Sequence, residues 1–378
     1  MKTILTNAKI TTMEQKNYEN GFISFTEGKI VAMGDMSDFS SADKSDEIVD
    51  LKGKWVYPGL VDPHGHIGMM EPIIGEKGDD VNEMTDVVTP QLNAVDAINP
   101  NDPSFMEALQ GGVTTCITGP GSANPIGGQM IAIKLLGTRV DDMILKAPLA
   151  IKMAFGENPK GVYGPRKVAP MTRMSTASII REALLKTQKY MVKESPEYDA
   201  KCEALIPLLK REIPAHMHAH RADDIYTAIR IAKEFNLDYR IVHCTEGWLI
   251  KEDLKKEGVK AFLGPILSEK SKPELTNLTT RAPGILSSFG VDVALCVDHP
   301  VIPQQYLPLC AALCVKNGMA EEEALKAVTI NSARLTGLDD RIGSLKVGKD
   351  ADIVVCDGNI LHSFTNCISV YVNGKKAF

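Results

Sequence analysis

Two histidines separated by one residue end an apolar segment in the first part of the chain. His64 and His66 close the run WVYPGLVDPHGH, whose apolar residues are typical of a buried β-strand. Because alternate residues of a strand point to the same side, both imidazoles can reach one point. Neutral imidazoles fixed in this way suit a borderline-soft divalent cation such as zinc. The pair therefore predicts part of a metal site.

Further candidate ligands follow this pair, and each ends an apolar segment of its own. They are Lys152 in PLAIKMAFG, His218 in IPAHMHAH, His243 in DYRIVHCTEG and Asp298 in VDVALCVDHP. A carboxylate such as Asp298 stays ionised beside a cation, so it can bind metal and exchange a proton with bound water. The set predicts one or two divalent metals that activate water for attack on a carbonyl or C=N carbon.

Other polar residues near these segments are candidates for catalysis and for substrate binding. His220, two residues after His218, can hydrogen-bond substrate or stabilise a developing oxyanion, and a surface-loop histidine is an equal alternative. Arg166 and Arg221 can bind a substrate carboxylate, or they can be solvated loop charges. We therefore predict Asp298 and His220 as catalytic residues. The loops that determine the substrate are expected at 68–90, 118–129 and 156–167.

The elements that position these residues are short apolar segments alternating with segments of helical periodicity, such as 222–235 and 246–258. This alternation predicts an α/β fold with a parallel sheet. In a closed (β/α)8 TIM barrel, every strand opens its C-terminal end on one face, which brings distant residues together. The third expected strand could instead leave the barrel as an excursion. The expected strands are 57–64, 113–119, 129–134, 148–153, 214–218, 239–243, 259–263 and 292–297.

The two ends of the chain show strand alternation separated by Gly, Asn and Asp turn signals. Neither end has enough apolar residues for a core of its own. Residues 1–57 and 340–378 together predict one small composite β-sandwich domain, and residues 58–339 predict a metal-dependent hydrolase barrel. A chain of 378 residues has room for a barrel of about 250 residues and a smaller module.

Composition and charge restrict the location and the partners. Hydrophobic residues make up 44% of the chain, as is ordinary for a globular protein with a sizeable core. The net charge of −6 argues against nucleic-acid and anionic-membrane partners, which require a basic surface. No apolar stretch suits a bilayer, and the first residues lack a signal-peptide pattern, so we expect a cytoplasmic location. We expect a small-molecule substrate, and the barrel is compatible with a homo-oligomer.

The order of these segments closely resembles the amidohydrolase superfamily along essentially the whole chain. The likeness rests on PGLVDPHGH, Lys152, two later histidines, Asp298 and the C-terminal GSLKVGKDADIVV. Members similar to imidazolonepropionase and to the metal-dependent prolidase or arginine-carboxypeptidase group look nearest. The resemblance implies a hydrolase acting on C–N bonds, with a divalent metal, zinc first among them.

The resemblance also bears on Lys152. In the family, an IK pair before a small-residue loop marks a lysine that reacts with CO2, and the resulting carbamate bridges two metals; IKMAFGEN resembles this pattern. The imidazolonepropionase type instead uses a single metal without such a lysine. The alternative is an ion pair of Lys152 with Glu157 or Asp62, because a buried charged lysine needs a partner.

Three functions stay open from the sequence. The first is metal-dependent hydrolysis of an amide, a dipeptide, an acyl-amino acid or a cyclic amide, with Asp298 as general acid and base. The second is deamination of a small heterocycle by the same chemistry, and ammonia among the products would identify it. The third is a non-catalytic metal-binding barrel.

Overall fold

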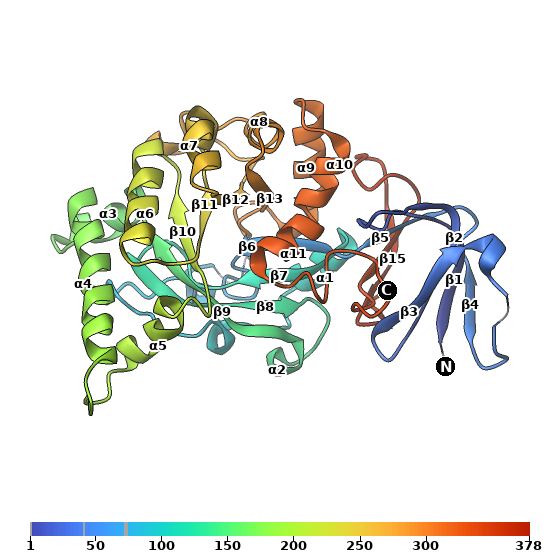
Figure 1. Ribbon diagram of the computed structural model, residues 1–378, viewed down its shortest axis with the longest axis horizontal. Coiled ribbons are helices and arrows are strands. Elements are labelled where there is room, and N and C mark those ends of the chain that lie inside the picture. The colour runs from blue at the N-terminus through green and yellow to red at the C-terminus, as the bar shows by residue number, and fades with distance from the viewer. Residues whose placement is uncertain (1, 41, 72–74) are drawn as a thin grey trace.

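The structure, a computed structural model, describes residues 2–40, 42–71 and 75–378. Within the expected substrate loop 68–90, residues 72–74 lie outside the described residues. A barrel with surrounding helices forms one part of the molecule, and a β-sheet containing both chain ends lies beside it (Figure 1). None of the helices in the described ranges is both long and apolar enough to cross a membrane.

Eight strands form the barrel sheet, and their order in the sheet is their order in the chain. The strands fall on the eight predicted segments, so the predicted α/β barrel is confirmed. They are β6 (Leu60–Gly65), β7 (Val113–Thr118), β8 (Ile126–Lys134), β9 (Ile144–Ala154), β10 (Ala215–Ala219), β11 (Tyr239–His243), β12 (Lys260–Leu263) and β13 (Asp292–Leu295).

Strand β8 departs from the predicted parallel arrangement. It pairs antiparallel with β7 and with β9, whereas the other ladders of the barrel are parallel. Only residues 119–125 connect β7 to β8, and this is too short for the crossover that a parallel neighbour requires. The chain therefore turns back at the C-terminal end of β7. Residues 119–125 thus lie at the same end of the barrel as the histidines at the C-terminal end of β6.

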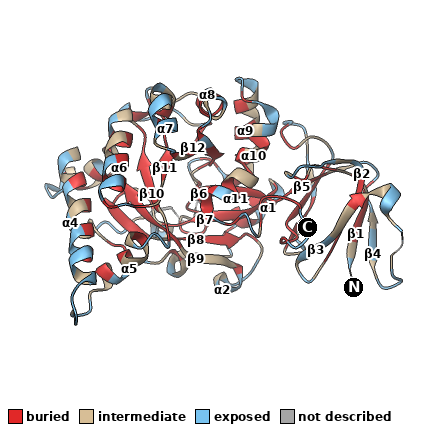
Figure 2. Ribbon diagram, viewed as in Figure 1, coloured by how far each residue is buried: buried red, intermediate tan, exposed pale blue. Residues whose placement is uncertain are grey.

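Helices cover the outside of the barrel, and their buried sides face the strands (Figure 2). In α6, Ile225, Ala228, Ile229 and Ala232 recur at helical spacing and are all buried. The predicted helix at 222–235 is thus α6. The helices are α1 (Ser104–Gln110), α2 (Val140–Met143), α3 (Glu157–Tyr163), α4 (Arg173–Met191), α5 (Ala200–Leu209), α6 (Ala222–Glu234), α7 (Lys251–Lys256), α8 (Ala282–Phe289), α9 (Leu307–Lys316), α10 (Glu321–Ala327) and α11 (Ile330–Thr336).

The first and last barrel strands meet without a regular ladder, and Asp62 on β6 joins them. Its carboxylate accepts hydrogen bonds from the backbone N–H of His64 at 3.1 Å, from that of Val297 at 3.4 Å and from the Gln304 amide at 3.2 Å. The backbone N–H of His66 donates to the carbonyl of His299 at 2.9 Å. These bonds hold the end of β6 against the segment that follows β13, where Asp298 lies.

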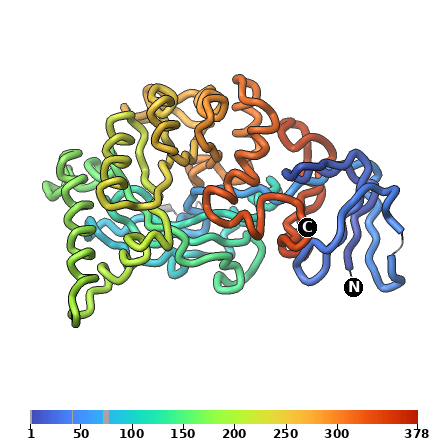
Figure 3. The backbone as a smooth tube through the Cα atoms, in the orientation of Figure 1, coloured from blue at the N-terminus to red at the C-terminus, as the bar shows by residue number. Residues whose placement is uncertain are grey.

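The second sheet combines strands from both ends of the chain, as predicted (Figure 3). The C-terminal β14 pairs antiparallel with β5, the strand just before the barrel. One apolar cluster contains buried residues of both chain ends, so the two ends together form a core that neither forms alone. Its members include Leu5, Ile23, Phe25, Ile353 and Tyr371. The strands are β1 (Thr3–Ile10), β2 (Tyr18–Thr26), β3 (Lys29–Asp35), β4 (Glu47–Asp50), β5 (Trp55–Pro58), β14 (Ile353–Cys356), β15 (Cys367–Val372) and β16 (Lys375–Lys376).

Asp350 and Asp352, in the segment KDAD before β14, connect this sheet to the barrel. The buried Asp350 carboxylate lies 3.1 Å from the ammonium of Lys134 on β8, 2.6 Å from that of Lys29 and 2.8 Å from the Arg341 guanidinium. Lys134 also pairs with Asp352. The family-like KDAD segment thus supplies a buried ionic contact between the two parts of the molecule.

Candidate metal centre

Six of the side chains predicted from sequence form two adjoining groups at one end of the barrel. His64, His66 and Asp298 make one group, and in it the potential ligand atoms all lie within 4.8 Å of one another. The second group has the same compactness and consists of His218, His220 and His243. They stand at or just beyond the C-terminal ends of β6, β13, β10 and β11. The rings of His64 and His243 connect the groups, with centroids 5.8 Å apart.

Four of the histidines are held through Nδ1, which leaves Nε2 available to a ligand. His66 Nδ1 lies 2.6 Å from the Gly119 carbonyl and His243 Nδ1 lies 2.7 Å from the Gly264 carbonyl. Because a carbonyl only accepts, both rings carry their proton on Nδ1. His218 Nδ1 lies 2.8 Å from Ser122 Oγ, and His220 Nδ1 lies 2.7 Å from Thr245 Oγ1. Histidines that bind metals are typically fixed through the second nitrogen in this way.

The buried polar atoms that face the centre lack hydrogen-bond partners among the described residues. They are His218 Nε2 and Asp298 Oδ1, whereas Glu274 Oε1 pairs with Lys272 Nζ at 2.5 Å. Buried polar atoms are seldom left unpaired in folded proteins, because desolvation without a partner is costly. Imidazole nitrogens and carboxylate oxygens together are the donors that zinc prefers. The residues present therefore fit a divalent metal.

Asp298 lies between the two histidines of β6. Its Oδ1 is 3.2 Å from His66 Nε2 and 3.6 Å from His64 Nε2, and its side chain remains 14% exposed. A carboxylate that touches the centre and also reaches solvent can exchange protons with water. Asp298 thus has the contacts that its predicted role requires.

Two residues of the centre have left-handed backbone conformations. The φ angles are +72° at His243 and +56° at Asp298. This region is uncommon for residues other than glycine and costs on the order of 1 kcal/mol or more. Both residues stand where the chain turns away from a strand end. The fold thus accepts local strain at the points that direct these side chains to the centre.

Burial and charge determine the protonation of the centre. Burial lowers the pKa of His243 to about 4 and holds the pKa of His64 well below its usual value, so both rings are neutral at pH 7. Burial alone would raise the pKa of Asp298, but His243, His66 and Lys152 outweigh it and hold that pKa below the ordinary carboxyl value. The centre therefore combines neutral imidazoles with an ionised carboxylate.

Lys152 is fully buried on β9 and faces the same centre. Its Nζ lies 2.8 Å from His64 Nε2, and burial lowers the pKa of its ammonium to about 8. Asp62, one of the carboxylates considered as its partner, instead binds the backbone amides at the β6–β13 junction. Lys152 is thus positioned beside the histidines of β6.

The arginines and His220 lie in different surroundings. Arg221 is half-buried and pairs with Asp223 at 2.9 Å, and exposed Arg166 donates to the carbonyl of Met84 at 2.7 Å. These contacts agree with the alternative of loop charges, and substrate binding by the arginines stays a prediction. His220 is buried, and its ring stacks on that of His243 with centroids 4.5 Å apart, which excludes the surface-loop alternative.

Sequence reasoning missed four side chains that contact the centre. Ser122 and Thr245 hold histidines, and Glu274 and Lys272 lie on the loop after β12. Glu274 is buried, with Oε1 3.6 Å from His220 Nε2 and 3.8 Å from His218 Nε2. In the segment SKPEL nothing distinguishes this glutamate from a solvated loop carboxylate. The loop folds over the barrel end, and only that packing brings Glu274 to the histidines.

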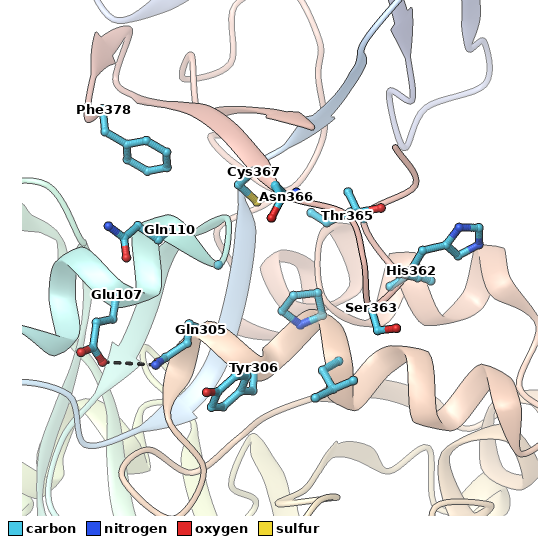
Figure 4. Close-up of a pocket in the computed structure, with 15 residues that line it drawn as sticks. Glu107, Gln110, Gln305, Tyr306, His362, Ser363, Thr365, Asn366, Cys367 and Phe378 are labelled. Carbon is cyan, nitrogen blue, oxygen red and sulfur yellow. Dashed lines mark hydrogen bonds between the residues drawn. The ribbon is translucent and has the colours of Figure 1, made fainter. Parts of the chain in front are cut away.

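A cavity of about 740 Å³ lies away from these residues, between the barrel and the C-terminal segment. Figure 4 shows its lining, including Glu107 and Gln305, which are joined by a 3.2 Å hydrogen bond, and His362 and Cys367. None of the six side chains of the two groups lines it. The candidate centre is therefore separate from this cavity.

Comparisons with known proteins agree with the geometry. Residues 55–377 match the sequence model of the amidohydrolase family. The chain is similar to the amidohydrolase tasK of Hapsidospora irregularis, at 30% identity over 393 residues; the match covers 95% of this chain but only 39% of that protein. A crystal structure of an amidohydrolase from Thermotoga maritima MSB8 is 43% identical, with a TM-score of 0.95 and coverage of 100% of this chain and 99% of that one.

A further similarity is confined to part of the chain. The 5-methylthioadenosine/S-adenosylhomocysteine deaminase of Bacillus thuringiensis (strain Al Hakam) is 45% identical over 71 residues. Those residues make up 18% of this chain and 16% of the deaminase.

Proposed function

Because this chain belongs to the amidohydrolase family, we propose that it is a metal-dependent hydrolase that cleaves a C–N bond of a small amide, dipeptide, acyl-amino acid or cyclic amide. One observation carries the proposal. Histidines from three different strands, fixed through Nδ1, gather with the ionised Asp298 at one end of the barrel. Such a donor set supports water activation better than a structural role, because Asp298 stays partly accessible to solvent.

His64, His66 and Asp298 would hold the metal, and Lys152 with His218 of β10 and His243 of β11 would supply further ligands beside them. A bound divalent metal lowers the pKa of a coordinated water toward about 7 and polarises a substrate carbonyl. Zinc is the proposed metal, because imidazole and carboxylate donors match its preference.

Asp298 would move the proton in this reaction. It is ionised at neutral pH, so it can accept a proton from the attacking water and then donate it to the leaving nitrogen. Its Oδ1 lies within 3.6 Å of both β6 histidines, which keep the carboxylate oriented toward the centre. General acid–base catalysis of this kind contributes about 10²–10⁴-fold to a rate.

Lys152 is proposed to be carboxylated. In this step the neutral amine forms an N–C bond to CO2, one amine proton leaves to solvent, and an anionic carbamate results. The full burial of Lys152 and its 2.8 Å distance from His64 Nε2 support this, because a buried ammonium there would be repelled by a divalent cation bound to His64. The carbamate would add a negative ligand between the two groups of histidines.

Deamination of a small heterocycle is the second candidate, and the 71-residue similarity to a deaminase favours it. Both reactions need the same attack by activated water on an sp² carbon. They differ in the leaving group, which is ammonia in a deamination and a substituted amine or amino acid in the hydrolysis.

Both candidates are tested by incubating the zinc-loaded protein with dipeptides, N-acyl-amino acids, cyclic amides and aminopurines. Free amino groups and ammonia are measured separately. Release of primary amines without ammonia supports the hydrolase, and ammonia from the heterocycles supports the deaminase. Failure to turn over any of these classes with the metal in place would contradict both and favour a non-catalytic barrel.

A further inference from the structure

We propose that Cys356 and Cys367 are a redox-active pair, and that a peroxide converts them to a reversible disulfide which ties the two ends of the loop 357–366 together. The inference goes beyond the proposed function, because the pair lies in the second sheet and not at the metal centre. One cysteine belongs to β14 and the other to β15, and their Sγ atoms lie 3.8 Å apart.

A bulge in β15 brings the two cysteines opposite each other. Val355 of β14 pairs with Ser369 of β15, so a regular antiparallel ladder would place Cys356 opposite Ile368. The register shifts at this point, and Cys356 pairs with Cys367 instead. Bulges in β-strands redirect side chains in this way, and they are features of a fold rather than defects.

The positions of the two cysteines suit a disulfide. Residues directly opposite in an antiparallel pair have Cα atoms about 4.5–5.5 Å apart, and disulfides join residues whose Cα atoms lie about 4.4–6.8 Å apart. The sulfur atoms of a disulfide lie about 2.05 Å apart, so the two Sγ atoms must approach each other by about 1.8 Å. Rotation of each side chain about its own Cα–Cβ bond can supply this movement while the two strands stay paired.

Cys367 is the cysteine that an oxidant can reach. It is half-buried, whereas the other cysteines of the described chain are buried. It also lines the cavity of about 740 Å³ between the barrel and the C-terminal segment (Figure 4). Cys356 is 0% exposed. A small oxidant such as hydrogen peroxide can therefore reach Cys367 from the cavity, while burial protects Cys356.

The contact between the two thiols also favours reaction at Cys367. A hydrogen bond from the Cys356 thiol lowers the pKa of Cys367 and outweighs burial, because it stabilises the thiolate. The same contact, together with burial, raises the pKa of Cys356. Thiolates are the reactive form of cysteine, so Cys367 would be oxidised first and Cys356 would then attack it.

The oxidation has two steps. The Cys367 thiolate attacks one oxygen of hydrogen peroxide; the S–O bond forms, the O–O bond breaks, and the hydroxide that leaves combines with the proton lost by Cys367. The sulfur is thereby oxidised to a sulfenic acid, and the peroxide is reduced. The sulfur of Cys356 then attacks that of Cys367; the S–S bond forms, the S–O bond breaks, and the leaving hydroxide takes the Cys356 proton. Two thiols and one peroxide thus give one disulfide and two water molecules.

The disulfide would act on the loop between the two cysteines. This loop forms one wall of the cavity through His362, Ser363, Thr365 and Asn366. A bond between Cys356 and Cys367 closes a ring around the loop and restricts its movement. Reduction by a dithiol would open the ring again.

Thiol counting and peptide mapping test the pair directly. The zinc-loaded full chain is reduced, freed of reductant, treated with stoichiometric hydrogen peroxide, alkylated in urea and digested with chymotrypsin, which cleaves at Phe364 between the two cysteines. The wild type should lose two of its eight thiols and yield linked peptides that contain Cys356 and Cys367. Treatment with dithiothreitol should restore both thiols.

Three variants separate this pair from general oxidation. Cys356→Ala should form no disulfide and should leave a sulfenic acid on Cys367 that dimedone traps. Cys367→Ala should lose no thiol under the same treatment, because its remaining cysteines are buried. The matched control Cys202→Ala removes a buried thiol of α5 and should yield the same linked peptides as the wild type. Retention of all thiols by the wild type, or a disulfide between other cysteines, would overturn the pair.

Hydrogen exchange tests the effect on the loop. The backbone amides of 357–366 should exchange more slowly after oxidation of the wild type, because the ring restricts local opening. The same treatment of Cys356→Ala should leave their exchange unchanged. Equal exchange in the reduced and the oxidised wild type would overturn the control of the loop by the pair.

Discussion

Substitution of Ser122 by alanine should weaken metal binding without disturbing the barrel. Ser122 Oγ lies 2.8 Å from His218 Nδ1 and accepts a hydrogen bond from Nδ1–H when Nε2 binds metal. Without this contact the ring can rotate, and its proton can move to Nε2, where it blocks coordination. Loss of such an outer contact typically lowers metal affinity about 10–100-fold. This corresponds to about 1.4–2.7 kcal/mol.

The assay is a zinc titration in competition with a chromogenic chelator, with turnover measured at saturating zinc. Ser122→Ala should show the reduced affinity and recover most of its turnover when zinc is in excess. The control Ser178→Ala removes a hydroxyl that bonds Glu182 on the exposed side of α4, and it should match the wild type. Zinc affinity of Ser122→Ala within twofold or so of the wild type would refute the reasoning that fixed rings are needed.

Asp298→Asn should lower turnover by at least about 100-fold with the fold retained by circular dichroism, and near-normal turnover would remove Asp298 as acid and base. Because burial lowers the pKa of Lys152 to about 8, its amine becomes free as the pH rises through that value. At a fixed concentration of dissolved CO2, carboxylation should therefore accelerate from about pH 6 to about pH 9, seen as the added mass of one CO2 in the wild type and none in Lys152→Met; a pH-independent rate would contradict this. Asp350→Asn should lower the free energy of unfolding by about 3 kcal/mol at pH 7 in urea titrations. Burial would raise the pKa of Asp350, but Lys134, Lys29 and Arg341 outweigh it and lower that pKa. The stabilisation by ionised Asp350 is thus present above the ordinary carboxyl pKa of about 3.9 and is lost as the pH falls through the lower pKa of Asp350 in the folded protein. Equal free energies of unfolding for the wild type and Asp350→Asn at pH 7 would contradict the prediction.

The strands and most of the centre could be predicted because their signals are local. Each apolar run that ends in a histidine, lysine or aspartate indicates both a buried strand and the side chain at its end. His64, His66, His243 and Asp298 follow this pattern, and the structure gathers them at one barrel end. The pairing of the two chain ends also follows from local alternation, since neither end can bury its apolar face alone.

The features that could not be predicted depend on contacts between distant segments. The antiparallel direction of β8 follows from the short 119–125 connection. The apolar pattern of the strand itself is the same for either direction, so it could not predict this. Glu274 lies 54 residues or more from the two histidines it faces, on a loop of ordinary polar composition. Ser122 and Thr245 are common loop residues, and only their positions against His218 and His220 give them a role.

Anomalous X-ray diffraction at the zinc absorption edge, from crystals grown with zinc, tests the central claim most directly. A peak about 2.0–2.2 Å from His64 Nε2, His66 Nε2 and an Asp298 carboxylate oxygen is the predicted result. Crystals that hold zinc elsewhere, with no anomalous peak among these three side chains, would contradict it.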